Sequence, residues 1–230
     1  MISVFLYRDL PRLFSFDKIH TMTIKTKYKK LIILLVIAVL AVSVWGAWYV
    51  IYSRYVKYVG IDIKPSRDHD PIIIKYYLQN DLSWASDNLG SSTSTLGGAG
   101  CLISSLASAI THVDSDIDPQ QLNNKLTAVD AYTDDGELIW YKIKDAIPSV
   151  DYRYTRVPSS ATIEKDLREG RLPIVNVRFH KNGVTHWVLI VGTQDGEFLI
   201  SDPLNHDLTY LPLSIHGKIY AYRVIVKAQQ

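Results

Sequence analysis

The sequence predicts an α+β domain, with N-terminal helices packed on a C-terminal antiparallel sheet, preceded by one transmembrane helix. Three observations predict this plan. A long uncharged apolar run lies near the N-terminus. Apolar residues then recur at helical spacing, and after about residue 172 they alternate at strand spacing between turn signals. Helices followed by strands are typical of an α+β domain rather than of alternating α/β units.

The first element is the apolar run. Residues 31–52 carry no charge, and at ~1.5 Å per residue they can cross a hydrocarbon core of ~30 Å. Lysines precede the run and aromatic residues occupy its far end: Lys25, Lys27, Lys29, Lys30, Trp45, Trp48, Tyr49 and Tyr52. The positive-inside rule then places the N-terminus in the cytoplasm and the rest of the chain outside it. The alternative is a signal peptide cleaved near Ala41-Val42-Ser43, which would release a secreted domain. Met22 is an alternative start to Met1.

We expect four regions along the chain: a basic cytoplasmic N-terminus at 1–30, a signal-anchor helix at 31–53, a stalk at 54–70 and a folded domain at 71–230. The net charge of +2 is unevenly distributed, with +7 in residues 1–60 and −5 in residues 61–230. The basic pI of 8.5 therefore belongs to the anchor. Because the domain is mildly acidic and has no basic stripe, we expect no nucleic-acid partner.

Helices are expected in four segments of the domain. The segment 101–111 carries an apolar stripe, and Asp118-Pro119 is a good N-cap and N1 pair for a second helix. Residues 137–147 have weaker helical periodicity, and a short helix at 162–169 should end before Gly170. The strand-like segments that follow are 172–179, 185–191, 198–202, 208–213 and 219–226, with turn signals at Asn182-Gly183 and Asp195-Gly196.

The single cysteine, Cys101, excludes an internal disulfide and stands where a helix should begin. Gly97, Gly98 and Gly100 precede it and give a loop that can approach a ligand closely. A helix N-terminus lowers a thiol pKa and offers backbone amides to an oxyanion. A buried structural cysteine is the alternative, but it would suit the middle of the helix equally well. The position therefore favours a nucleophile.

A base for this nucleophile is expected at His186, which begins a strongly apolar strand where packing needs no polar residue. Asp202 ends the next strand. If Gln194-Asp195-Gly196 form a three-residue loop, Thr193 pairs with Glu197, and His186 and Asp202 share one face. A two-residue Asp195-Gly196 turn would place them on opposite faces. The hypothesis that Asp202 orients His186 therefore predicts a bulged turn.

The segments YYLQNDLSWA, GAGCLISSLASAI, THWVLIVG and FLISDP, in this order, resemble the C39-like cysteine peptidases, relatives of papain. The resemblance covers about residues 73–204 and implies a papain-like cysteine peptidase fold. It also implies that Gln79 donates a side-chain N–H to the oxyanion, together with the backbone N–H of Cys101. Leu102 departs from the family pattern, which puts the shape of the binding pocket in doubt. Candidate substrate-binding residues are Trp187 and Gly100, although Trp187 could equally be core packing.

No cofactor and no metal ion are expected. Asp114-Ser115-Asp116-Ile117-Asp118 begins like a calcium loop but lacks its glycine and bidentate glutamate. His112, His206 and His216 are interpreted as surface or turn residues. The function we expect is that of a membrane-anchored, extracytoplasmic bacterial cysteine peptidase or amidase acting through a Cys101 thioester. The alternatives are a catalytically silent domain of the same fold that binds peptide or cell-wall components, and a transpeptidase.

Overall fold

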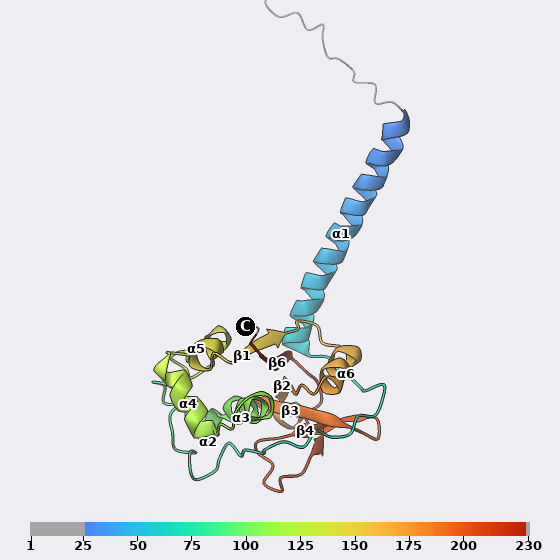
Figure 1. The fold of residues 1–230 in the computed structure, drawn as a ribbon. Coiled ribbons are helices and arrows are strands. Elements are labelled where there is room, and N and C mark those ends of the chain that lie inside the picture. Colours follow the sequence, from blue (N-terminus) through green and yellow to red (C-terminus); the bar gives the residue numbers. More distant parts are fainter. Residues whose placement is uncertain (1–25, 229–230) are drawn as a thin grey trace, which may run out of the picture. The chain divides into compact units, whose positions relative to one another are not determined.

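The computed structural model describes residues 26–228 (Figure 1). The chain divides into two compact units, residues 1–48 and 49–230, and each is described by itself. The expectations for residues 1–25 lie outside the described residues. All elements of the sheet and the shorter helices belong to the second unit.

Helix α1 (Thr26–Val59) contains the expected apolar run and extends it in both directions. Within the described part of the chain it alone is long and apolar enough to cross a membrane, with a mean hydropathy of 2.7 over its most apolar window. A core helix or a signal sequence would meet the same criteria, so this property makes α1 a candidate membrane span. The helix ends where Gly60 adopts a φ of +73°.

Residues 61–72, which we call the strap, run along the sheet of the second unit. Ile61 pairs with Ile219 through two backbone hydrogen bonds of 3.0 and 2.9 Å. Ser66 donates to the buried carboxylate of Glu164, and the backbone N–H of His69 donates to the Thr193 hydroxyl. The segment 54–70, which we expected as a stalk, therefore consists of the end of α1 and most of the strap. Ser66 and His69 in this segment bond to buried side chains. A polar composition alone cannot distinguish such a packed segment from an exposed one.

The helices of the second unit are α2 (Leu96–Ala99), α3 (Cys101–Val113), α4 (Pro119–Ala128), α5 (Ile143–Ala146) and α6 (Ser160–Arg168). Helix α4 begins as expected, because the Asp118 side chain accepts from the Gln121 N–H within a capping box. The helix expected at 137–147 is shorter, a 3₁₀ turn η1 (Trp140–Lys142) followed by α5. The residues before it form a tight turn closed by the Tyr132–Leu138 bridge, in which Gly136 has a φ of +83°.

The sheet is antiparallel and six-stranded, in the order β1-β6-β2-β3-β4-β5. Its strands are β1 (Val150–Tyr154), β2 (Pro173–Arg178), β3 (Thr185–Gln194), β4 (Glu197–Ser201), β5 (Leu211–Pro212) and β6 (Ala221–Lys227). Edge strand β1 was not expected from the sequence because only one of its residues is buried. The strand expected at 208–213 is reduced to β5, and the preceding residues form an irregular loop.

The β3–β4 turn differs from the three-residue loop that we expected. Gln194 pairs with Glu197, so Asp195 and Gly196 form a two-residue turn with φ values of 52° and 74°. These are the positive φ angles of a type I′ turn. The register then shifts by one residue at a bulge between Ile190 and Gly192, beyond which Leu189 pairs with Ser201. The bulge restores the register that the expected loop would have given.

Apolar side chains cover both faces of the sheet. One core joins α3, α4 and α5 to Ile174, Leu189 and Ile225. The other joins α6 to Val175, Val188 and Ile200. In Figure 1, helices α2 to α5 gather on one side of the domain, with α6 on the other side. Helices packed on an antiparallel sheet confirm the predicted α+β class.

Candidate active site

Cys101 is the first residue of α3, directly after the one-turn helix α2. Thr95 caps α2, and the Gly100 N–H donates to the Leu96 carbonyl. A side chain at position 100 would place its Cβ 2.4 Å from that carbonyl oxygen, so the close junction between the helices requires glycine. Cys101 is 8% exposed, and it lies at the positive end of α3, where the first N–H groups lack intrahelical acceptors.

His186 and Asp202 lie side by side at the end of the β3–β4 pair. The imidazole Nε2 of His186 is 2.7 Å from Asp202 Oδ1, and both residues are 3% exposed. The Leu204 N–H also donates to Oδ1, at 2.9 Å. Because Nε2 faces the carboxylate, Nδ1 remains for the thiol, and interactions with Cys101 contribute to the raised pKa of His186. The structure therefore brings His186 against Asp202, and Cys101 and His186 line the same cavity.

His216 lies in a turn, as the sequence analysis allowed, but its burial and its membership in this cluster were not expected. It is fully buried, and its Nε2 lies 2.9 Å from Asp202 Oδ2. It follows the 3₁₀ turn η3 (Leu213–Ile215), and only the fold of the irregular loop after β4 brings it back to Asp202. No local pattern around His216 signals this contact.

The charges of the site follow from these contacts. Burial lowers the pKa of His186, but hydrogen bonds and charge interactions with Asp202 and Cys101 outweigh it and raise the pKa to about 9. Burial raises the pKa of Asp202, but hydrogen bonds from His186 and His216 hold it well below its ordinary value. Asp202 is therefore anionic and His186 cationic at neutral pH.

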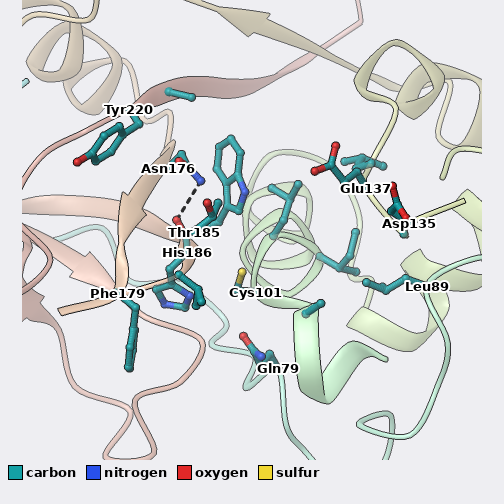
Figure 2. Close-up of a pocket in the computed structure, with 18 of the residues that line it drawn as sticks. Gln79, Leu89, Cys101, Asp135, Glu137, Asn176, Phe179, Thr185, His186 and Tyr220 are labelled. Atoms are coloured by element: carbon teal, nitrogen blue, oxygen red, sulfur yellow. Dashed lines mark hydrogen bonds between the residues drawn. The ribbon is translucent and has the colours of Figure 1, made fainter. Parts of the chain in front are cut away.

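Gln79 reaches the same site from a loop that precedes α2. Its backbone N–H donates to the Pro203 carbonyl, directly after Asp202. Its side-chain Nε2 donates to the Gly97 carbonyl at 2.9 Å, which leaves one N–H of the amide for another acceptor. The side chain is buried and lines the same cavity as Cys101. Figure 2 shows Gln79, Cys101 and His186 around one end of this cavity.

The cavity has a volume of about 920 Å³. Trp187 lines it and packs on Trp140 with a centroid separation of 5.7 Å. Asp135 and Glu137 lie at the end opposite His186 (Figure 2). Gly100, the other expected substrate-binding residue, does not line the cavity and instead forms the junction between α2 and α3.

Three side chains of the cluster are of the types that bind metal ions. His186, Asp202 and His216 each offer one ligand atom, and these atoms lie within 4.8 Å of one another. The nitrogen–oxygen distances of 2.7 and 2.9 Å are those of hydrogen bonds. They are shorter than the ~3.3 Å edge of a tetrahedral zinc site with bonds of ~2.0 Å. The geometry therefore fits a hydrogen-bonded His–Asp–His cluster better than a metal centre.

Comparison with known proteins agrees with the resemblance seen in the sequence. The profile of the Peptidase_C39 like family matches residues 72–222. A solved structure from Bacillus anthracis, assigned as a C39-like peptidase, is similar with 14% identity and a TM-score of 0.43, over 57% of this chain and 90% of that chain. No curated protein matches this chain. Because the family profile spans well over half of the sequence, the chain belongs to the Peptidase_C39 like family.

Proposed function

We propose that this protein is a membrane-anchored, extracytoplasmic cysteine peptidase or amidase in which Cys101 is the nucleophile. One observation carries the proposal. A thiol at the start of a helix lines the same cavity as an imidazole that is hydrogen-bonded to a buried carboxylate. Membership in a peptidase family supports a peptide or related amide as the substrate.

The proposed reaction begins with attack of the Cys101 thiolate on the carbonyl carbon of the substrate. The carbon–sulfur bond forms, and the carbonyl electron pair moves to oxygen. The Cys101 N–H and the remaining N–H of Gln79 stabilise this oxyanion. The imidazolium of His186 then gives its proton to the leaving amine, the carbon–nitrogen bond breaks, and a thioester remains.

Water resolves the thioester in the second half of the proposed reaction. Neutral His186 takes a proton from a water molecule as the water attacks the thioester carbonyl. The new tetrahedral intermediate collapses, the carbon–sulfur bond breaks, and the thiolate leaves while His186 keeps the proton. Asp202 accepts a hydrogen bond from Nε2 throughout, which fixes the tautomer and favours the charged imidazolium.

The proposal is tested by the reactivity of Cys101 toward iodoacetamide. Since the chain has a single cysteine, intact-mass analysis measures alkylation of this thiol alone. We expect rapid alkylation at pH 6, and an at least tenfold slower reaction in His186→Gln. The exposed-histidine variant His206→Gln is the matched control and should react like wild type. Equal rates at pH 6 for wild type and the denatured protein would contradict the proposal.

Turnover is tested by trapping. Incubation with a peptide mixture followed by rapid acid quench should leave an acyl adduct on Cys101, and Cys101→Ala should form none while keeping its circular dichroism spectrum. Addition of a nucleophilic amine separates hydrolysis from transpeptidation, since only a transpeptidase accumulates the amine conjugate. Reactivity at pH 6 without any adduct or product would favour a binding domain over an enzyme.

The proposed orientation is tested by labelling intact cells with a membrane-impermeant maleimide. In a Cys101→Ala background, Asp134→Cys introduces a thiol in an exposed loop of the domain. It should be labelled without cell lysis and remain in the membrane fraction. Ser15→Cys, which precedes α1 in the sequence, should be labelled only after lysis. Recovery of the domain in the medium would indicate signal cleavage instead.

A further inference from the structure

Both oxygens of the Asp202 carboxylate are held in place. Oδ1 accepts from His186 and from the Leu204 N–H, and Oδ2 accepts from His216. A carboxylate with partners on one oxygen can still rotate about its χ2 bond, whose preference is broad. A donor on the second oxygen fixes the plane of the carboxylate, and with it the direction in which His186 is held.

The other nitrogen of His216 determines which tautomer this residue adopts. The backbone N–H of His180 lies 3.1 Å from His216 Nδ1. A backbone N–H can only donate, so Nδ1 is an acceptor and the proton of the neutral ring is on Nε2, facing Asp202. The His180 N–H therefore directs the Nε2–H of His216 toward Asp202.

The backbone at His180, which donates to His216 Nδ1, has an unusual left-handed conformation. His180 and Lys181 have φ values of 47° and 76°, in the left-handed region that costs free energy for residues other than glycine. They lie in the 3₁₀ turn η2 (Phe179–Lys181) between β2 and β3. The groups that face His216 are His180 from η2, His186 from β3 and Asp202 after β4. The Phe179 ring packs against both His186 and His216.

We infer that His216 is a positioning residue, which locks the Asp202 carboxylate through Oδ2 so that His186 presents Nδ1 to Cys101. The inference rests on the proposed function, because positioning has a meaning only if His186 and Cys101 react. His216 does not line the cavity, so it can act on the reaction only through Asp202 and His186. Without it, Asp202 keeps a buried oxygen that lacks a donor, and the carboxylate rotates to satisfy it.

Two substitutions separate positioning from packing. His216→Leu removes both hydrogen bonds, whereas the amide of His216→Gln can still donate to Asp202 from near the Nε2 position. We expect the alkylation rate of Cys101 at pH 6 to fall about tenfold or more in His216→Leu and to recover in large part in His216→Gln. His112→Leu, at a histidine whose Nε2 lies 2.9 Å from the Gly170 carbonyl oxygen, controls for loss of an imidazole.

The outcomes distinguish this inference from the proposed function. A folded His216→Leu that keeps the wild-type alkylation profile between pH 5 and 9 overturns the inference and leaves the proposed function standing. A wild-type thiol that reacts like that of the denatured protein overturns the proposed function itself. If His216→Leu does not fold, imidazole ¹⁵N spectra of the wild-type chain test the inference, because they show which ring nitrogen of His216 carries the proton. The neutral His216 ring should carry its proton on Nε2, and a proton on Nδ1 overturns the inference.

Discussion

His186 and Asp202 share one face of the sheet because of an extra residue in β3. Between the hairpin turn and the Leu189–Ser201 pair, β3 is one residue longer than β4. The tight Asp195-Gly196 turn alone would place them on opposite faces. The bulge between Ile190 and Gly192 reverses the parity, and the two side chains meet at 2.7 Å. The strap fills the bulge, since the Ile72 N–H donates to the Val191 carbonyl and the Thr193 N–H donates to the His69 carbonyl.

Gly192→Ala should displace the strap and weaken the site. A Cβ at this position would lie 2.7 Å from Pro71 Cα and 2.9 Å from the His69 carbonyl oxygen, both backbone atoms. We expect a loss of about 1–3 kcal/mol in the free energy of unfolding, measured by urea denaturation. The alkylation rate of Cys101 should also fall, because the bulge sets the register of His186 against Asp202.

Gly196→Asn is the control within the same hairpin. Among residues 26–228, no atom lies within 4 Å of a Cβ at this position, and asparagine tolerates the φ of +74°. We expect its stability and its alkylation rate to remain near those of wild type. Equal behaviour of the two glycine variants would show that the bulge does not control the site.

Asp202→Asn should reduce the reactivity of Cys101 by about a hundredfold or more. Asparagine keeps the shape of the side chain but replaces one acceptor oxygen by a donor, so it cannot accept from both His186 and His216. Stopped-flow alkylation at pH 6 measures the effect. Asp207→Asn, at an exposed position of the same loop, should react as wild type does. A small effect at position 202 would mean that the carboxylate does not orient His186.

Hydrolysis through Cys101 should persist unusually far into the alkaline pH range. Because the pKa of His186 is raised from 6.5 to about 9, the imidazolium persists across neutral pH. Its contribution to folding stability is complete below about pH 6.5 and is lost as the pH rises through about 9. Hydrolysis that needs the imidazolium as an acid should decline over the same interval. An alkaline limb near pH 6.5 would contradict the raised pKa.

Gln79→Ala should separate acyl transfer from alkylation. Iodoacetamide reacts without forming an oxyanion, so its rate should change little. Acylation by p-nitrophenyl acetate passes through an oxyanion and should slow by about 10–1000-fold. The release of p-nitrophenolate measures this rate. Gln120→Ala, in α4, is the control for loss of a glutamine. A parallel fall of both rates at Gln79→Ala would indicate a structural role instead.

Glu164→Gln should loosen the strap. Burial raises the pKa of Glu164, but hydrogen bonds from Ser160 and Ser66 and the charge of His69 outweigh it and lower the pKa to about 2. The stability from this carboxylate is complete above about pH 4.5 and is lost as the pH falls toward 2. We expect the variant to lose about 1–3 kcal/mol at pH 7 by urea denaturation. Glu169→Gln, at an exposed ion pair with Arg171, should lose less than about 1 kcal/mol.

Much of the fold was predictable because its signals are local. The apolar stripe after Cys101, the Asp118-Pro119 cap and the period change after residue 172 each depend on neighbouring residues, and each corresponds to an element of the structure. Strand β1 was missed because it is an edge strand with one buried residue, so it lacks an apolar pattern. The catalytic roles assigned to Cys101, His186, Asp202 and Gln79 remain predictions that the experiments above test.

The sequence by itself determined the α+β class, the apolar N-terminal helix and the position of a lone thiol at a helix start, because each follows from spacing along the chain. Only the tertiary structure decided that Asp202 reaches His186 and that His216 completes the cluster. The first contact depends on the β3 bulge, whose backbone groups bond to strap residues more than a hundred positions earlier in the sequence. The second depends on an irregular loop. Hydrogen bonds between distant segments set both contacts, and no local pattern encodes them.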